Sequence, residues 1–204
     1  KSPAKSCELD PIPTSILKKN IDSVLPVITQ IVNQSLQSGY FPHKYKMAAV
    51  LPLLKKANLE ITLKNFRPVS NLEFVGKLLE RAVVSQLVDY LDTNMLFEEM
   101  QSAYRKNCST ETALLRVYND FLMSIDDQQC VLLVLLDLSA AFDTVDHNIL
   151  FSQLATRFGI TGNVLKWVES YLSERSQYVT VNGVKSTTKE LLWGVPQGSV
   201  LSPI

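Results

Sequence analysis

The sequence predicts an α+β protein, because it carries two different hydrophobic periodicities. Residues 21–36 and 72–91 repeat apolar side chains at the spacing of one helix face. Residues 130–136 form an unbroken aliphatic run, and residues 178–183 alternate as a strand does and end in Asn-Gly, a pair that favours a tight hairpin turn. Helices therefore dominate the first part of the chain, and strand signals are strongest in the second.

The helix predicted over residues 21–36 should end at Gly39, because glycine readily adopts the left-handed conformation that closes a helix. The short apolar run 47–54 then predicts a strand, which carries Lys55 and Lys56 at its end.

Two further helices are predicted in the first part of the chain. Residues 72–91 form one by their apolar periodicity, and residues 110–125 form the other. Ser109 or Thr110 is expected to be the N-cap of the second, because a short hydroxyl side chain accepts hydrogen bonds from free N–H groups of the first turn.

The second part opens with residues 130–136, of which six are Val or Leu. The run is too short for a typical buried helix and is rich in Val, so a core strand is predicted, with Asp137 at its carboxyl end. Helices are then predicted over residues 148–158 and 163–172.

Asp146 or His147 is expected to cap the first of these two helices. Residues 191–193 should pair with the strand at 178–183 to close a hairpin, and a further helix is expected to begin near Val200.

The composition is that of a globular chain, with 204 residues of which 46% are hydrophobic and 20% charged. Its three cysteines (Cys7, Cys108 and Cys130) are odd in number and far apart, which fits neither a disulfide framework nor a zinc site and favours a reducing compartment. No apolar run approaches the roughly 20 residues that cross a bilayer, so neither a membrane span nor secretion is predicted. Because the chain starts without Met and stops inside what reads as a continuing segment, both ends are expected to be cut.

The charge is unevenly distributed, although 20 basic and 20 acidic residues cancel over the whole chain. Residues 44–81 hold eight basic and three acidic side chains, a surplus of five, whereas the chain from Asn107 onward holds six basic and ten acidic ones. Charge alone leaves two interpretations open for the basic segment, a nucleic-acid-binding surface and an ordinary solvated face.

Asp137 likewise has two interpretations on spacing alone. An acid at the end of a core strand, near a glycine loop delivered by a hairpin, has the layout of a metal or phosphate site. An aspartate that caps the turn after a strand is also common.

Four strings in the chain resemble motifs of the reverse transcriptases of non-LTR (LINE-type) retrotransposons. They are Asn65-Phe-Arg-Pro-Val-Ser70, Gln101-Ser-Ala-Tyr-Arg-Lys106 with Ser109-Thr-Glu-Thr-Ala113, Leu135-Leu-Asp-Leu-Ser-Ala-Ala-Phe-Asp-Thr-Val-Asp-His147, and Gly194-Val-Pro-Gln-Gly-Ser-Val-Leu-Ser-Pro203. They follow the family's order along the chain.

The resemblance implies a right-hand polymerase fold, with helix-rich fingers over residues 1–127 and the first part of an antiparallel palm sheet over residues 128–204. It implies an RNA-directed DNA polymerase that uses an RNA template, a DNA primer and deoxynucleoside triphosphates in the cytoplasm and nucleus. Two Mg²⁺ ions would serve the nucleotidyl transfer, because hard cations of this kind take oxygen ligands. It implies no oligomeric state.

The resemblance also assigns roles to individual residues around the aliphatic run. Asp137 matches the first catalytic aspartate, a ligand of both metal ions, and the backbone carbonyl of Leu138 would be a second ligand. Phe142 matches the bulky gate that excludes a 2′-OH from the incoming nucleotide, and its alternative is a core aromatic. Asp143, Asp146 and His147 are expected to make turn hydrogen bonds and a helix cap.

Basic and glycine-loop positions complete the implied site. Arg67 and Arg105 match finger residues that hold the triphosphate or the template, where a guanidinium can make two hydrogen bonds to one phosphate. Lys55 is a further candidate for contacts with nucleic acid. In the loop, Gln197 and Gly198 match positions beside the templating base and the nascent pair. Gly194 is expected to approach the nucleic acid.

The chain departs from the family pattern in two ways. Ala103 stands where the family usually has Gly. The aromatic-x-Asp-Asp hairpin that should supply the partners of Asp137 does not follow the glycine loop, and Asp126-Asp127 lies at the end of a predicted helix. The chain as given is therefore expected to be inactive, and two alternatives stay open: a nucleic-acid-binding remnant without catalysis, and a decayed element.

Overall fold

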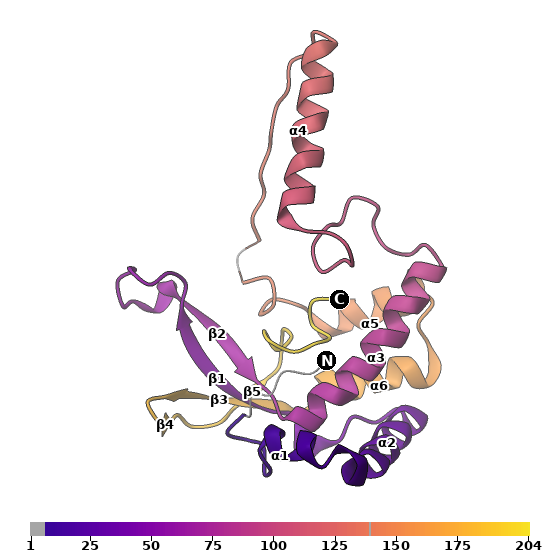
Figure 1. Ribbon diagram of the computed structural model, residues 1–204, viewed down its shortest axis with the longest axis vertical. Coiled ribbons are helices and arrows are strands. Elements are labelled where there is room, and N and C mark those ends of the chain that lie inside the picture. The colour runs from indigo at the N-terminus through magenta and orange to yellow at the C-terminus, as the bar shows by residue number, and fades with distance from the viewer. Residues whose placement is uncertain (1–6, 139) are drawn as a thin grey trace.

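The computed structural model describes residues 7–138 and 140–204, and within them six α-helices and two short 3₁₀-helices accompany one mixed sheet. The helices are α1 (Thr14–Lys19), α2 (Ile21–Ser38), η1 (His43–Tyr45), η2 (Leu63–Asn65), α3 (Phe74–Thr93), α4 (Thr110–Asp126), α5 (His147–Thr156) and α6 (Gly162–Leu172). The strands are β1 (Met47–Leu54), β2 (Phe66–Asn71), β3 (Arg175–Val181), β4 (Val184–Lys185) and β5 (Lys189–Leu191). This arrangement confirms the predicted mixture of helices and sheet (Figure 1).

The sheet joins two distant parts of the chain. Its order is β2-β1-β3-β4, and β5 also pairs with β3. β1 is antiparallel to β2 and parallel to β3, so that Val50 lies opposite both Ser70 and Val179. The C-terminal strands are therefore fixed beside the β1–β2 hairpin, and this brings the segment after β5 close to β2.

The five helices predicted from hydrophobic periodicity are α2, α3, α4, α5 and α6, and every end lies within two residues of its predicted position. Their predicted caps are confirmed as well. Gly39 follows α2 with a φ of 65°, and its N–H donates to carbonyls of the last helical turn. Ser109 forms a reciprocal capping box with Thr112, and Asp146 accepts hydrogen bonds from the first two amides that follow His147.

The core lies where α2, α3 and α6 meet. Phe41 is fully buried, and its ring meets Trp167 and Tyr171 of α6 edge to face, with centroid distances of 5.5 and 5.1 Å. From α3, Leu79 and Val83 pack into the same cluster. In the described part of the chain, no helix is long and apolar enough to cross a membrane.

The core strand predicted over residues 130–136 is wrong, because these residues pair with no strand in the described part of the chain. Their side chains are exposed, 87% for Leu132 and 89% for Leu136. Figure 1 shows this segment running beside α4, and the two project together from the rest of the molecule; no residue of α4 is buried. Aliphatic composition indicates a preference for burial, but a buried strand also needs neighbours to satisfy its backbone groups.

The last residues also differ from the prediction. No helix begins near Val200 in the described residues, where the chain forms turns; the Val200 amide donates to Glu80, and the Ser202 amide donates to the Ser199 hydroxyl. The Asn182-Gly183 turn joins β3 to β4, whereas β5, which ends at Leu191, pairs with the first part of β3, so only one of the predicted residues 191–193 lies in a strand.

β2 was not predicted as a strand. It contains Pro68, which cannot donate a hydrogen bond and is tolerated in a sheet mainly on an edge strand. β2 is such an edge, because β1 is its only neighbour in the described sheet.

A matched pair of leucine substitutions tests the exposure of residues 130–136. Leu79→Ala should lower the free energy of unfolding by about 2–5 kcal/mol, because Leu79 is fully buried in the core. Leu132→Ala should change it by less than about 0.5 kcal/mol, because the side chain is 87% exposed. Urea denaturation measures both. Comparable losses at the two sites would mean that the segment is buried in solution.

Candidate functional site

Residues 194–203, here named the glycine loop, connect three segments that are far apart in the sequence. The loop follows β5 and contacts the turn before α5, the outer edge of β2, and α3. Each of these contacts involves the loop backbone.

The first contact joins Gly194 to the turn before α5. The N–H of Gly194 donates to the Val145 carbonyl at 2.8 Å, and the N–H of Val195 donates to the Phe142 carbonyl at 2.7 Å. Nε2 of His147 lies 2.7 Å from the Gly194 carbonyl oxygen; because a carbonyl can only accept, Nε2 carries the proton. A Cβ on Gly194 would lie 2.6 Å from the Phe142 oxygen, so only glycine allows this approach.

The second contact holds the loop against β2. The N–H of Ser70 donates to the Gln197 carbonyl at 2.7 Å. Gly198 follows with a φ of 118°, and a Cβ there would lie 2.8 Å from the Ser70 carbonyl oxygen. Gln197 is half-buried and Gly198 is exposed, so the backbone at Gly198 faces solvent beside β2.

The third contact is with a buried carboxylate. The N–H of Val200 donates to Oε2 of Glu80 on α3, and the Tyr171 hydroxyl donates to Oε1 at 3.2 Å. Burial raises the pKa of Glu80, and the Val200 amide and the positive charge of Arg175 oppose this shift.

A cavity of about 190 Å³ lies where the turn and the glycine loop meet. Phe142 and Val145 line it from the turn, Val195 and Ser202 line it from the loop, and Tyr104 lines it from the segment 101–106. The half-buried ring of Phe142 therefore faces a space that the loop and Tyr104 share. Together with the Ser70 contact, the cavity brings all four of the strings singled out in the sequence to one region.

The sequence match agrees with this convergence. Residues 53–204 match the family described as reverse transcriptase (RNA-dependent DNA polymerase). The chain belongs to the reverse transcriptase family.

Named relatives of the chain include RNA-directed DNA polymerases of Drosophila mobile elements. The RNA-directed DNA polymerase from mobile element jockey of Drosophila melanogaster is 32% identical over 182 residues, which cover 89% of this chain and 20% of that protein. The probable RNA-directed DNA polymerase from transposon BS of the same species is 32% identical over 98% of this chain and 22% of its own length. The predicted resemblance to non-LTR reverse transcriptases is thus confirmed, and the chain spans about a fifth of these relatives.

Reverse transcriptases use divalent metal ions, so the surroundings of Asp137 matter. Asp137 and Leu138 lie on the exposed segment, the latter 80% exposed. Among residues 7–138 and 140–204, no three or more His, Cys, Asp or Glu side chains are grouped so that they could hold a metal ion. These residues alone therefore do not fit a metal centre at Asp137.

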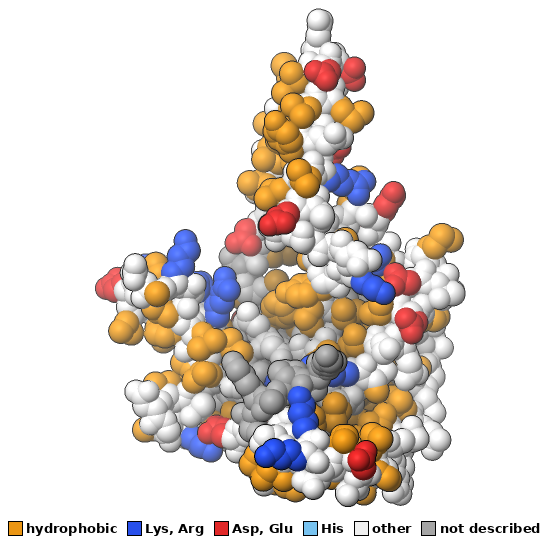
Figure 2. All heavy atoms as spheres, in the orientation of Figure 1, with side chains coloured by type: hydrophobic (Ala, Val, Ile, Leu, Met, Phe, Trp, Pro, Cys, Tyr) orange, Lys and Arg blue, Asp and Glu red, His pale blue; other side chains and the backbone are white. Residues whose placement is uncertain are grey.

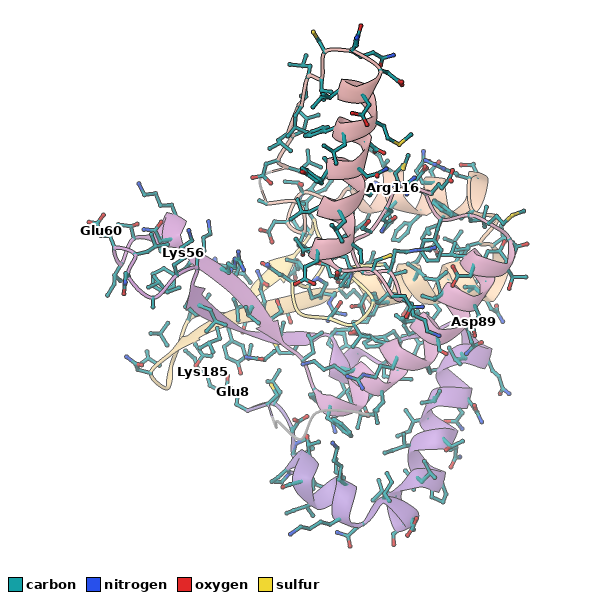
Figure 3. All side chains as sticks on the ribbon, turned by 45° about the horizontal axis from the view of Figure 1, so that its top comes forward. Glu8, Lys56, Glu60, Asp89, Arg116 and Lys185 are labelled. Carbon is teal, nitrogen blue, oxygen red and sulfur yellow. The ribbon has the colours of Figure 1, made fainter. Side chains whose placement is uncertain are left out.

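Two of the predicted basic residues lie on the β1–β2 hairpin. Arg67 is exposed on β2, opposite Leu53. Lys55 follows β1, and its ammonium group donates to the Lys64 carbonyl at 2.8 Å across the hairpin. Figure 2 shows Lys and Arg side chains at the outer end of the hairpin, where Figure 3 labels Lys56. The hairpin thus carries several basic side chains, with Glu60 beside them at its outer end.

Arg105 makes its contacts with residues that lie between α3 and α4 or at the end of α3. Its guanidinium lies 3.3 Å from the Asp92 carboxylate and 3.8 Å above the centroid of the Phe97 ring. The side chain is partly buried in this position. Asp92 and Phe97 are therefore the local partners of the Arg105 guanidinium.

Sequence reasoning missed two residues that hold the glycine loop. Glu80 follows the core residue Leu79 and precedes Val83 by three, so it interrupts the apolar face of α3; that interruption was a readable signal. Ser70 belongs to a matched string, but nothing in the sequence indicates that its amide meets Gln197.

A pair of glycine substitutions tests the seat of the loop on β2. Gly183→Ala should cost about 1 kcal/mol in the free energy of unfolding, because φ is 81° but no atom lies within 4 Å of the added Cβ. Gly198→Ala should cost more, because its Cβ meets the Ser70 carbonyl and the backbone must shift. Urea denaturation gives the cost, and hydrogen exchange of the Ser70 amide shows whether the loop has moved. Equal costs with unchanged exchange would contradict the close contact.

Proposed function

We propose that this chain forms the part of an RNA-directed DNA polymerase that contacts the template strand and the incoming nucleotide. The observation that carries the proposal is the position of the glycine loop, which is hydrogen-bonded both to β2 and to the turn after Asp137. At this position a backbone without a side chain, at Gly198, faces solvent next to the strand that carries the exposed Arg67. A base or a sugar can approach such a backbone closely.

We propose that residues 1–127 are the fingers and that residues 128–204 are the first part of the palm. The β1–β2 hairpin supports this division, because it extends basic side chains away from the helical core (Figure 3). The division places the glycine loop in the palm and Ser70 in the fingers. The hydrogen bond between Ser70 and Gln197 would then join the two regions.

In this proposal Arg67 contacts phosphate, because an exposed guanidinium can make two hydrogen bonds to one phosphate group. Gln197 and Gly198 lie beside the nascent base pair, and Gly194 allows the loop backbone to approach the turn. Phe142 serves as the steric gate for the sugar, and the cavity beside its ring supports that role.

Lys55 and Arg105 are proposed contacts with less support. The ammonium group of Lys55 already bonds the Lys64 carbonyl, although two more of its N–H groups remain for phosphate. Arg105 would have to leave Asp92 and Phe97 before it could reach nucleic acid.

The proposed partners are an RNA template, a DNA primer and deoxynucleoside triphosphates, which implies the cytoplasm and nucleus. In the complete reaction two Mg²⁺ ions would use Asp137 and the Leu138 carbonyl. Because the described residues group no further carboxylates beside Asp137, a nucleic-acid-binding role without catalysis is the second candidate.

Salt-dependent binding to an RNA–DNA primer–template tests the proposal. Arg67→Ala should weaken binding and reduce the slope of log affinity against log salt by about 1, because one phosphate contact is lost. Arg116→Ala is the matched control: Arg116 is an exposed arginine on α4, away from the hairpin (Figure 3). Its substitution should leave the slope unchanged.

Fluorescence anisotropy at several salt concentrations measures both slopes. If the unsubstituted chain does not bind, or if Arg67→Ala and Arg116→Ala behave alike, the hairpin is not the nucleic-acid surface.

A further inference from the structure

Glu80 is a buried acid in an otherwise apolar core. It is 1% exposed, and its neighbours on α3, Leu79 and Val83, belong to the core cluster. A carboxylate in such a place is costly unless it is hydrogen-bonded and its charge is balanced. The structure meets both requirements, and each partner comes from a different segment.

Both carboxylate oxygens of Glu80 have donors. Oε2 accepts from the Val200 amide, and the Leu201 amide lies close enough to contribute. Oε1 accepts from the hydroxyl of Tyr171, which is itself 1% exposed. One side of the carboxylate thus faces the glycine loop, and the other faces α6.

Arg175 supplies the opposite charge. It is also 1% exposed, donates through Nη1 to the Tyr171 carbonyl at 2.9 Å, and lies 4.8 Å from the centroid of the Tyr171 ring. No direct ion pair joins it to Glu80 in the described part of the chain, so the two charges act on each other across Tyr171. The carboxylate is therefore oriented by its hydrogen bonds and not by an arginine fork.

Residues 194–203 contain no charged side chain, and Glu80 is the charged side chain that accepts a hydrogen bond from the loop backbone. The loop's other attachments to the core are the partly buried side chains of Val195 and Leu201. Val200 lies two residues after Gly198, which limits their Cα separation to roughly 7 Å. Fixing the Val200 amide therefore restricts where Gly198 and its neighbour Gln197 can lie.

We propose that Glu80 is a positioning residue, whose carboxylate holds the Val200 amide and thereby sets the glycine loop against Ser70 of β2. The role is mechanical and does not require contact with nucleic acid. Only its consequence, correct placement of Gln197 and Gly198 for the template and nucleotide, rests on the proposed function.

Two substitutions at Glu80 separate the effect of side-chain length from the effect of the negative charge. Glu80→Gln keeps the length of the side chain, so its carbonyl oxygen can still accept from Val200 while its amide group donates to the Tyr171 oxygen. Glu80→Asp keeps the charge but withdraws the carboxylate by one methylene. If Glu80 acts by balancing charge, Glu80→Gln should have the larger effect on the loop. If Glu80 acts by positioning the Val200 amide, Glu80→Asp should have the larger effect.

Amide hydrogen exchange of the full chain reads the position of the loop without any nucleic acid. The Ser70 amide is the reporter, because it bonds Gln197 and does not touch Glu80. The Lys55 amide, which bonds the Asn65 carbonyl, reports whether the β1–β2 hairpin itself remains folded. The matched control is Glu73, a second buried glutamate near the start of α3, which makes no hydrogen bond or ion pair with the loop in the described part of the chain.

Glu80→Asp should accelerate hydrogen exchange of the Ser70 amide by about tenfold or more and leave exchange of the Lys55 amide unchanged. The Val200 amide then loses its acceptor, and the loop that carries Gln197 is no longer held against Ser70. Glu80→Gln should stay within about threefold of the unsubstituted chain, and neither Glu73 variant should affect Ser70 selectively. Unchanged Ser70 exchange in Glu80→Asp, or equal acceleration in Glu80→Gln, would overturn the proposal.

If Glu80→Asp also accelerates exchange of the Lys55 amide, the hairpin itself has been perturbed, and Tyr171→Phe is then used as the test variant instead of Glu80→Asp. This variant keeps the ring and removes the hydroxyl that orients Oε1. Faster exchange at Ser70 with Lys55 unchanged would support positioning, and no change at Ser70 would overturn it. Because no ligand is present, a failure here is distinct from a failure to bind primer–template.

Discussion

The packing of three aromatic rings governs the rest of this structure. Phe41, from the segment after α2, meets Trp167 and Tyr171 of α6, while the Trp167 indole N–H donates to the Ser35 hydroxyl at 2.9 Å. These contacts fix α6 against α2 and hold the Tyr171 hydroxyl in the core beside α3. The Tyr171 hydroxyl donates to Glu80, and Glu80 accepts from the Val200 amide of the glycine loop. The position of the loop therefore depends on the aromatic cluster.

The helices could be predicted because each carries its own signal. In α2 and α3 the apolar residues recur on one face, and Gly39 ends α2 in the left-handed conformation that its sequence position indicates. The strand expected at residues 130–136 failed for the opposite reason. Strand formation is settled by neighbours across the sheet, and an aliphatic run says nothing of whether those neighbours are there.

The candidate site likewise contains features that could be predicted from the sequence and features that could not. The glycines at 194 and 198 could be singled out from the sequence, because a residue without a side chain marks a close approach wherever it occurs. What they approach could not be derived: the Phe142 carbonyl and the Ser70 carbonyl come from segments more than 50 residues away. The role of Glu80 could be predicted in part, since a charge on the apolar face of a helix indicates a buried partner but does not identify that partner.

The bond between Ser70 and Gln197 has one more consequence, for the association of this molecule with other chains. Hydrogen-bonded pairs alternate along an antiparallel ladder, and the bond from Lys55 to Asn65 fixes the phase, so Pro68 and Ser70 direct their backbones outward from β2. Pro68 has no N–H, and that of Ser70 is occupied by Gln197. The outer edge of β2 therefore offers no free N–H at Pro68 or Ser70 to an added strand, and the loop that shapes the site also disfavours strand addition at this edge.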